Sequence, residues 1–470
     1  MTETPQQERT RLLAARWESL APELKTKTQL IGKTAVACGA THHVMERCNF
    51  SCTCCYLGAD ANKTEPLPFE DVAKQLDAIR EHLGDGGKTQ ITAGEVTLLP
   101  LEELGRIVRY ALEIGLDPMV MTHGQRFLDE PEYLIALVRD YGLSKVSIHV
   151  DTTQRGRHGC DSRMSEADLH RVRDAFAQLI RRVRRETGLP FEAASTVTVT
   201  QGNLESMHAV VEWFLSNCDA FRMLSFQPVA DVGRTRKHQS AVEVQNEALW
   251  EEVTSACGRV LNATPMHFGH PKCNTTVPMV IARVGRERVI FEAIREKSDA
   301  DESIFQAAVE TIGPAMDWTR SIVGNLPALL KIMYSKPRFT LGVMNYSIRR
   351  VWDERQRILK LIGLSVYQLK LPKVKPFILV VHNFMSPGEM DTEVGKARLE
   401  ACVFKVPVDG QMISMCEMNA SGLRAKIDQM QLKRPKVVES APDRLAPSRI
   451  RESRLHTPTP EPGPVPFAEL

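Results

Sequence analysis

The sequence predicts an α/β protein whose core is a partial barrel of six strand–helix units, a partial (βα)6 arrangement. Between residues 39 and 232, short apolar runs alternate with longer stretches that have helical periodicity. Strands that alternate with helices of this length form a parallel sheet with right-handed crossovers. Six strands are too few for a closed eight-stranded barrel, so we expect an open or partial one.

Each predicted strand is a short apolar run, and each predicted helix is an amphipathic stretch that follows it. The predicted strands are residues 41–46, 88–93, 118–122, 145–150, 194–200 and 222–229. The predicted helices between them are residues 68–83, 101–115, 131–140, 165–187 and 204–216. Residues 6–30 predict a further, N-terminal packing helix.

The rhythm of strands and helices divides the chain into five predicted parts. These are an N-terminal helical segment at 1–38, the core at 39–232, a mainly helical cap or substrate region at 233–400, a cysteine-containing segment at 401–431 and a disordered tail at 432–470. The tail is rich in Pro, Arg, Ser and Glu and short of aromatic residues, which is typical of disorder.

Within the cap region we expect helices at residues 243–258 and 290–335 and a late strand at 374–382. The apolar piece at 322–334 predicts a buried helix pair or cap, with a lipid-contacting surface as the alternative.

Composition narrows the class of protein. The 470 residues are 43% hydrophobic and 25% charged, which is ordinary for a globular chain. A formal net charge of +2 gives no electrostatic reason to expect nucleic acid or an anionic membrane as a partner. We find neither a secretory leader nor an apolar run long enough to span a membrane, so we expect a cytoplasmic protein.

The strongest functional signal is a cluster of cysteines directly after the first predicted strand. Cys48, Cys52 and Cys55 form a C-x3-C-x2-C array, and Cys54 is left over as a packing thiol. Thiolates are the natural ligands of 4Fe–4S clusters. Three cysteines hold three of the four irons, so one iron stays open to bind a substrate or cofactor directly.

Other interpretations of the array remain open. A structural zinc site needs four ligands, for which His42 or His43 would have to complete the set. A thioredoxin-like motif lacks the expected helix after its cysteine pair. The cysteines could also be unligated, or could serve a non-catalytic iron–sulfur protein.

The cysteine loop resembles the signature of the radical S-adenosylmethionine (radical SAM) enzymes, whose core is a partial six-stranded barrel. The residues Thr92-Ala93-Gly94-Glu95, about 40 residues beyond Cys55, resemble the Gly-Glu turn that binds the cofactor's amino group in that family. Ala93 stands where a second glycine is common, which is a mild departure.

The resemblance implies further cofactor contacts at the ends of the later strands, where ligands of parallel barrels gather. Thr122 begins a Thr-His-Gly turn, and Arg155 or Arg157 could meet the cofactor carboxylate. The remaining implied contacts to S-adenosylmethionine are His149, Asp151, Thr198 and Gln227. An ordinary loop role is the alternative for each.

The resemblance also implies the chemistry: an oxidoreductase that cleaves S-adenosylmethionine reductively to a 5′-deoxyadenosyl radical, with electrons from an external flavodoxin- or ferredoxin-type donor. The protein would orient the cofactors and exclude water. The substrate is a small molecule or lipid, with an apolar one favoured; the alternative is a maturase that modifies a peptide or protein.

Three later cysteines, Cys273, Cys402 and Cys416, are candidates for an auxiliary iron–sulfur cluster, with His267 or His270 as a fourth ligand. The stretch 384–419 resembles the C-terminal part of the tetraether-lipid synthase branch. The Gly-His-Pro-x-Cys piece that ends at Cys273 resembles that branch too, but Phe268 stands where the branch tends to have another cysteine. Isolated buried cysteines are the alternative.

Overall fold

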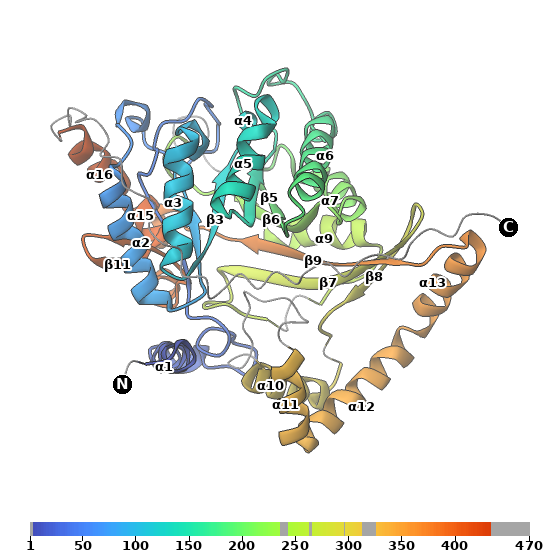
Figure 1. The fold of residues 1–470 in the computed structure, drawn as a ribbon. Helices are drawn as coiled ribbons and strands as arrows, with labels where there is room; N and C mark the ends of the chain where they lie inside the picture. The colour runs from blue at the N-terminus through green and yellow to red at the C-terminus, as the bar shows by residue number, and fades with distance from the viewer. Residues whose placement is uncertain (1–2, 236–242, 263–265, 296, 313–325, 434–470) are drawn as a thin grey trace, which may run out of the picture. The chain divides into compact units, whose positions relative to one another are not determined.

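The computed structural model describes residues 3–235, 243–262, 266–295, 297–312 and 326–433, and these form one sheet with helices packed on it (Figure 1). The sheet order is β11-β10-β1-β2-β3-β4-β5-β6-β9-β7-β8. The strands are β1 (Cys38–Ala40), β2 (Gly87–Ile91), β3 (Leu116–Thr122), β4 (Lys145–His149), β5 (Glu192–Val199), β6 (Phe221–Pro228), β7 (Asn274–Val284), β8 (Glu287–Glu292), β9 (Lys373–His382), β10 (Phe404–Val408) and β11 (Gln411–Ser414).

Every pairing from β10 through β9 is parallel, whereas β11, β7 and β8 add antiparallel edges. The parallel α/β core that the sequence predicts is therefore present. Two late strands extend it, because β9 pairs with β6 and β10 pairs with β1.

The helices follow the predicted alternation through the core. They are α1 (Pro5–Glu18), α2 (Phe69–Leu83), α3 (Leu101–Glu113), α4 (Gln125–Asp129), α5 (Pro131–Tyr141), α6 (His170–Thr187), α7 (Met207–Ser216), α9 (Asn246–Cys257), α10 (Asp299–Ile312), α11 (Leu326–Ser335), α12 (Pro337–Asp353), α13 (Arg355–Gln368), α14 (Glu393–Glu400), α15 (Met415–Ala420) and α16 (Leu423–Leu432). None of the described helices is both long and apolar enough to cross a membrane.

Helix α2 illustrates how the pattern builds the core. Val72, Leu76, Ile79 and Leu83 recur at helical spacing and are all buried against the sheet. Burying each such side chain contributes about 1.5–3 kcal/mol relative to leaving it in water. The same logic holds for α3, α5, α6 and α7, which Figure 1 shows on one face of the sheet.

The first strand is displaced from its predicted position. It was expected at residues 41–46 but spans Cys38–Ala40. His43 has a φ of 55°, which interrupts the extended chain, and the side chains of His42 and Glu46 are held in buried polar contacts instead of alternating across a sheet.

The region at 233–400 contains more strand than the sequence analysis found. The late strand predicted at 374–382 is β9, but residues 287–292 form β8 instead of the beginning of a helix. β7 and β8 form an antiparallel hairpin through Gly285. The described part of the apolar piece at 322–334 lies in α11, which buries no residue, so the expectation of a buried helix pair is wrong there. The predicted tail lies outside the described residues, apart from its first two positions.

Candidate active site

The cysteine loop lies beyond the carboxyl end of β1, and neighbouring loops fix it on both flanks. The Ser51 backbone N–H donates to the carbonyl of Arg155 at 2.9 Å. The Cys55 backbone N–H donates to Thr235 Oγ1 at 3.2 Å. Because these partners come from the loops after β4 and β6, the Cys48–Cys55 loop is positioned by the sheet and not by its own residues alone.

All three cysteines of the array are partly buried and lie close enough to influence one another electrostatically. Burial raises the pKa of Cys48 to about 12 and also raises the pKa values of Cys52 and Cys55. The backbone N–H of Phe50 points at Cys48 Sγ, 3.4 Å away. Thiols in this setting stay protonated unless a cation binds them, which is the behaviour expected of metal ligands.

The Gly94 turn brings the end of β2 against the chain that leads into the cysteine loop. Gly94 has a φ of 66° and pairs with Met45 in a parallel bridge. A Cβ at this position would lie 2.0 Å from the Met45 carbonyl oxygen. Only glycine fits both the backbone conformation and the close approach.

The Glu95 carboxylate is buried and already holds its own protein donors. Its Oε1 accepts from the Thr97 hydroxyl and backbone N–H and from the Thr122 hydroxyl. Its Oε2 accepts the backbone N–H of His123 at 2.8 Å. A carboxylate has about four acceptor positions, so this side chain organises the ends of β2 and β3.

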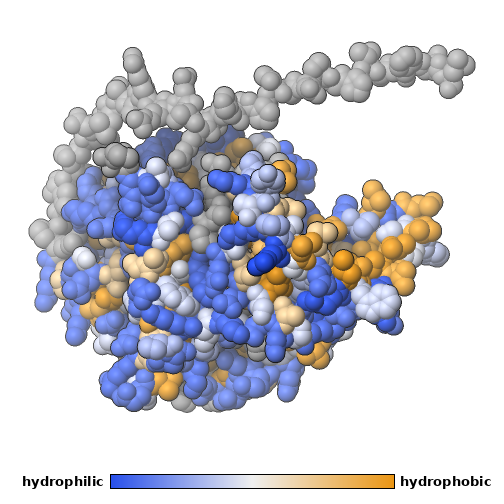
Figure 2. Space-filling model, turned by 90° about the horizontal axis from the view of Figure 1, so that it is seen from below, coloured by the Kyte–Doolittle hydropathy of each residue, from blue (hydrophilic) through white to orange (hydrophobic). Residues whose placement is uncertain are grey.

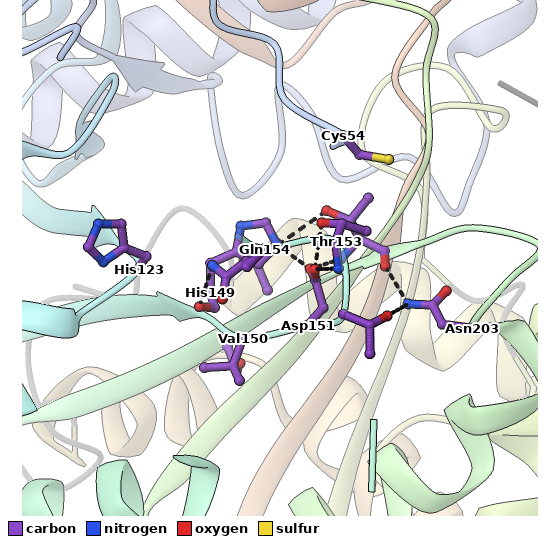
Figure 3. Close-up of polar contacts among 12 residues, drawn as sticks. Cys54, His123, His149, Val150, Asp151, Thr153, Gln154 and Asn203 are labelled. Carbon is purple, nitrogen blue, oxygen red and sulfur yellow. Dashed lines mark hydrogen bonds and ion pairs between the residues drawn. The ribbon is translucent and has the colours of Figure 1, made fainter. Parts of the chain in front are cut away.

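Asp151 is the centre of a second polar group, at the ends of β4 and β5 (Figure 3). Its carboxylate accepts from the ring of His149, from the Thr153 backbone at 2.8 Å and from the Thr198 backbone at 2.7 Å. Burial alone would raise the pKa of Asp151, but His149 and these donors outweigh it and lower that pKa. Thr198 Oγ1 lies 3.2 Å from His149 Nε2, and Gln227 is the β6 neighbour of Thr198 in the sheet register.

Arg157 lies between these two polar groups and is 4% exposed. Its Nη2 donates to the carbonyls of His123 and His149 and to the side chain of Gln154. Its Nε and Nη1 are buried and have no hydrogen-bond partner. Arg155, the other sequence candidate, instead donates to carbonyls of its own loop.

The family model of the radical SAM superfamily matches residues 43–207, which hold the cysteine loop, the Gly94 turn and the ends of β3, β4 and β5. Over residues 43–207 this chain is therefore similar to the radical SAM superfamily, whose enzymes use a 4Fe–4S cluster and S-adenosylmethionine.

Three solved structures resemble this chain distantly. Streptococcus suis SuiB bound to S-adenosylmethionine is 14% identical with a TM-score of 0.33, covering 47% of each chain. Native anSMEcpe with bound AdoMet is 15% identical with a TM-score of 0.32, covering 41% of this chain and 51% of its own. Methylornithine synthase (PylB) is 14% identical with a TM-score of 0.35, covering 55% of this chain and 73% of its own. The chain spans about half the length of the SuiB and anSMEcpe chains. No curated protein matches it.

The later cysteines come together from three segments that are distant in the sequence. Cys273 precedes β7, Cys402 follows α14 and Cys416 lies in α15, yet the three thiols influence one another electrostatically. The Arg398 guanidinium donates to Cys273 Sγ at 3.5 Å. His270 lies near Arg398, and burial lowers its pKa.

Sequence reasoning missed the aromatic contact that joins the cysteine loop to β3. The ring of His123 stacks on Phe50 with centroids 3.7 Å apart, and His123 Nε2 lies 2.8 Å from Asn49 Oδ1. The Thr-His-Gly turn marked the position of His123, but nothing in the spacing pairs it with a residue so much earlier in the chain.

A buried ionic network behind the loop was also missed. His43 Nε2 lies 2.7 Å from Asp428 Oδ1, and Arg424 Nη1 donates to Glu46 Oε1 at 2.6 Å. His42 is held by the Pro407 carbonyl at 2.7 Å. These contacts tie α16 and β10 to the residues before the cysteine loop, and they engage both histidines considered as zinc ligands.

Proposed function

We propose that Cys48, Cys52 and Cys55 bind the 4Fe–4S cluster and that the enzyme acts on an apolar, lipid-like substrate. The single observation that supports the cluster assignment is the fixed three-cysteine loop, which holds its partly buried cysteines at the carboxyl edge of a parallel sheet. When bound, the cluster and S-adenosylmethionine together supply a 5′-deoxyadenosyl radical, after one-electron reduction, that removes hydrogen from the substrate.

In this proposal, some residues at the strand ends bind S-adenosylmethionine directly, and others hold those side chains in position. Arg157 is the contact for the cofactor's carboxylate, because its Nε and Nη1 are buried donors without a partner. His149 and Thr198 face the same space and suit the ribose hydroxyls, with Gln227 beside them. Glu95 and Asp151 hold these groups in place, since their own acceptors are filled.

Anaerobic reconstitution followed by assay for 5′-deoxyadenosine tests the cofactor assignment. With dithionite and S-adenosylmethionine, the wild type should release 5′-deoxyadenosine, and Cys52→Ala should lose both the product and most of its iron. Cys54→Ala is the matched control in the same loop and should keep both. Zinc in place of iron, or no product from the wild type, would support a non-catalytic metal protein instead.

Cys273, Cys402 and Cys416 are proposed ligands of a second cluster. Their convergence from three segments and the cation beside them favour this over unrelated buried thiols. About eight irons per chain should be found after reconstitution, falling to about four in Cys273→Ala. Cys257→Ala, which removes a buried thiol elsewhere, should leave the count unchanged. A wild-type count of about four would exclude the second cluster.

The substrate class is supported by the resemblance of residues 384–419 to the tetraether-lipid synthase branch. Peptide modification is the alternative. Turnover with perdeuterated lipid and, separately, with a deuterated peptide library distinguishes the two. Deuterium should appear in 5′-deoxyadenosine only with the lipid; transfer from the peptides would favour a maturase.

A further inference from the structure

We call residues 326–371 the arm. The arm consists of helices α11, α12 and α13 and the few residues that follow them. No residue of these three helices is buried. Large apolar side chains along the arm are mostly in water, including Leu341 at 65%, Trp352 at 67%, Tyr334 at 92% and Leu371 at 89% exposed. Figure 2 shows orange, apolar side chains gathered over α12 and α13. Soluble proteins rarely expose a contiguous apolar surface of this kind without using it.

Helix α12 faces the rest of the protein with its polar side. The Tyr346 hydroxyl contacts the Arg295 backbone, Arg349 pairs with Asp301, and Arg350 donates to the Glu292 carbonyl at 2.6 Å. A helix packed on a water-soluble core ordinarily does the reverse and buries its apolar stripe.

The outward side of the same helix carries the apolar residues. Leu341, Met344, Ile348 and Val351 follow helical spacing and are each more than half exposed. α13 continues the pattern with Leu359 and further exposed apolar residues on its own turns. Polar contacts therefore anchor α12 to the rest of the protein, and its apolar stripe is left exposed to solvent.

The charge of the arm is strongly positive. Residues 326–371 hold nine Lys or Arg and only two acidic residues, Asp353 and Glu354. Glu354 is buried among Arg259, Arg295 and Arg357. The net positive charge of the arm is larger than the +2 of the whole chain, so the rest of the chain has a net negative charge. The net charge of the whole chain therefore conceals the basic arm.

Several cations of the arm are exposed. Lys331, Arg338, Lys360 and Lys370 are exposed and form no ion pair with another described residue. Basic side chains next to exposed Trp, Tyr and Leu are the combination that binds the interface of an anionic bilayer. The helices are 10, 17 and 14 residues long and are separated by Lys336 and Glu354, so they suit lying in the interface and not spanning it.

We propose that the arm docks this enzyme on the surface of an anionic lipid bilayer, with the apolar stripe of α12 and α13 in the headgroup–acyl boundary. A second copy of the chain fits less well, because pairing two arms would bring two strongly basic surfaces together. The inference goes beyond the proposed chemistry and does not depend on it, since docking needs neither the cluster nor turnover.

Vesicle flotation of the full chain tests the proposal. Phosphatidylcholine vesicles with about one third phosphatidylglycerol should bind the protein at least tenfold more tightly than phosphatidylcholine alone, and high salt should weaken that binding. Ile348→Glu with Leu359→Glu should lower binding at least tenfold, and so should Lys360→Glu with Lys370→Glu. All four side chains are exposed, so the variants should fold.

Val260→Glu is the matched control, because Val260 is 83% exposed and lies outside the arm. It should bind vesicles as the wild type does. The proposal is overturned if anionic and neutral vesicles bind alike, or if the arm variants keep wild-type binding. It is also overturned if sedimentation shows a dimer that Ile348→Glu abolishes while no vesicles are bound. Release of 5′-deoxyadenosine, measured without vesicles on the same protein preparations, reports separately on the proposed function.

Discussion

Arg157 combines deep burial with two unused donors, and both facts bear on how it would bind a ligand. Burial lowers the pKa of Arg157 to about 10, although the neighbouring Cys160 and Asp151 act in the opposite direction. The guanidinium therefore remains charged at neutral pH and lacks a counter-ion for Nε and Nη1. An anion placed there would relieve an unfavourable buried charge as well as gain hydrogen bonds.

Arg157→Gln should consequently weaken S-adenosylmethionine binding by about tenfold or more, which corresponds to one charge-assisted hydrogen-bond pair. Isothermal titration of the anaerobic holoenzyme measures the Kd. Arg185→Gln, an exposed arginine in the last turn of α6, is the control and should bind as the wild type does. An unchanged Kd in Arg157→Gln would remove Arg157 from the cofactor site.

Gly94 and Gly188 share a φ of 66° but differ in their surroundings. A Cβ at Gly188 would meet nothing within 4 Å, whereas at Gly94 it would collide with the Met45 carbonyl. Gly188→Ala should cost about 1 kcal/mol, the usual penalty of the left-handed region. Gly94→Ala should cost clearly more, which urea unfolding of both variants would measure. Equal costs would mean that the Met45 strand can shift.

At this scale, the sequence predicted residues whose chemistry is local and missed those that depend on tertiary approach. The spacing of Cys48, Cys52 and Cys55 is a local pattern, and it led to the superfamily whose model matches residues 43–207. Glu95 was singled out from its place after Gly94, but its hydrogen bonds to Thr122 and His123 depend on the pairing of β2 with β3. The unpartnered donors of Arg157 are likewise visible only once the surrounding chain is packed.

Helix α16 holds the approach to the cysteine loop through ion pairs instead of apolar packing alone. Arg424 is 3% exposed and Glu46 1% exposed, so each needs the other to compensate its buried charge. Removing one partner of such a pair ordinarily costs about 3–5 kcal/mol.

Arg424→Met should therefore lower the free energy of unfolding by several kcal/mol, as removal of one partner of a buried ion pair usually does. Thermal unfolding should show a clear drop in Tm relative to Lys426→Met, an exposed control on the same helix. Combining Arg424→Met with Glu46→Gln should cost less than the two single changes together, because neither charge is then left alone. Additive costs would show that the two residues act independently.

The elements themselves were predicted best where burial makes a regular pattern. β2 to β6 and the helices α2, α3, α5 and α7 lie within a few residues of their predicted bounds, whereas α6 begins at His170 and not at residue 165, and the short helix α4 was not predicted. β1 was misplaced because its three residues are too few to show a period, and buried polar residues followed them. The β7–β8 hairpin was missed although Val277 to Ile281 alternates between buried and less buried positions, since Pro278 interrupts the apolar run.

For the molecule as a whole, buried neutral histidines set the response to acid. Burial, with His43 and Arg424 nearby, lowers the pKa of His42 to about 3 from an ordinary 6.5. Below pH 6.5 the unfolded chain takes up a proton at this position while the folded chain does not. Stability is therefore lost as the pH falls from about 6.5, by about 1.4 kcal/mol per pH unit from this one group.

His42→Gln should flatten that dependence, because glutamine does not titrate. Urea unfolding between pH ~7.5 and about 5 measures this pH dependence of the free energy of unfolding. The protein is used without its cluster, so that loss of iron in acid does not contribute to the result. His158→Gln, which replaces an exposed histidine, should keep the wild-type slope. A wild-type slope in His42→Gln would mean that other groups dominate acid unfolding.

The pairing of β1 with β10 has a consequence for how the enzyme is made. Cys38 pairs with Phe404, and Pro407 and Asp428 hold the histidines that lead into the cysteine loop. A ribosome must therefore synthesise nearly the whole described chain before the strand ahead of the loop gains its second neighbour. Until β10 has been synthesised, the cysteine loop follows a strand, β1, that lacks one of its two neighbours. Delivery of iron and sulfide to this site would follow translation and not accompany it.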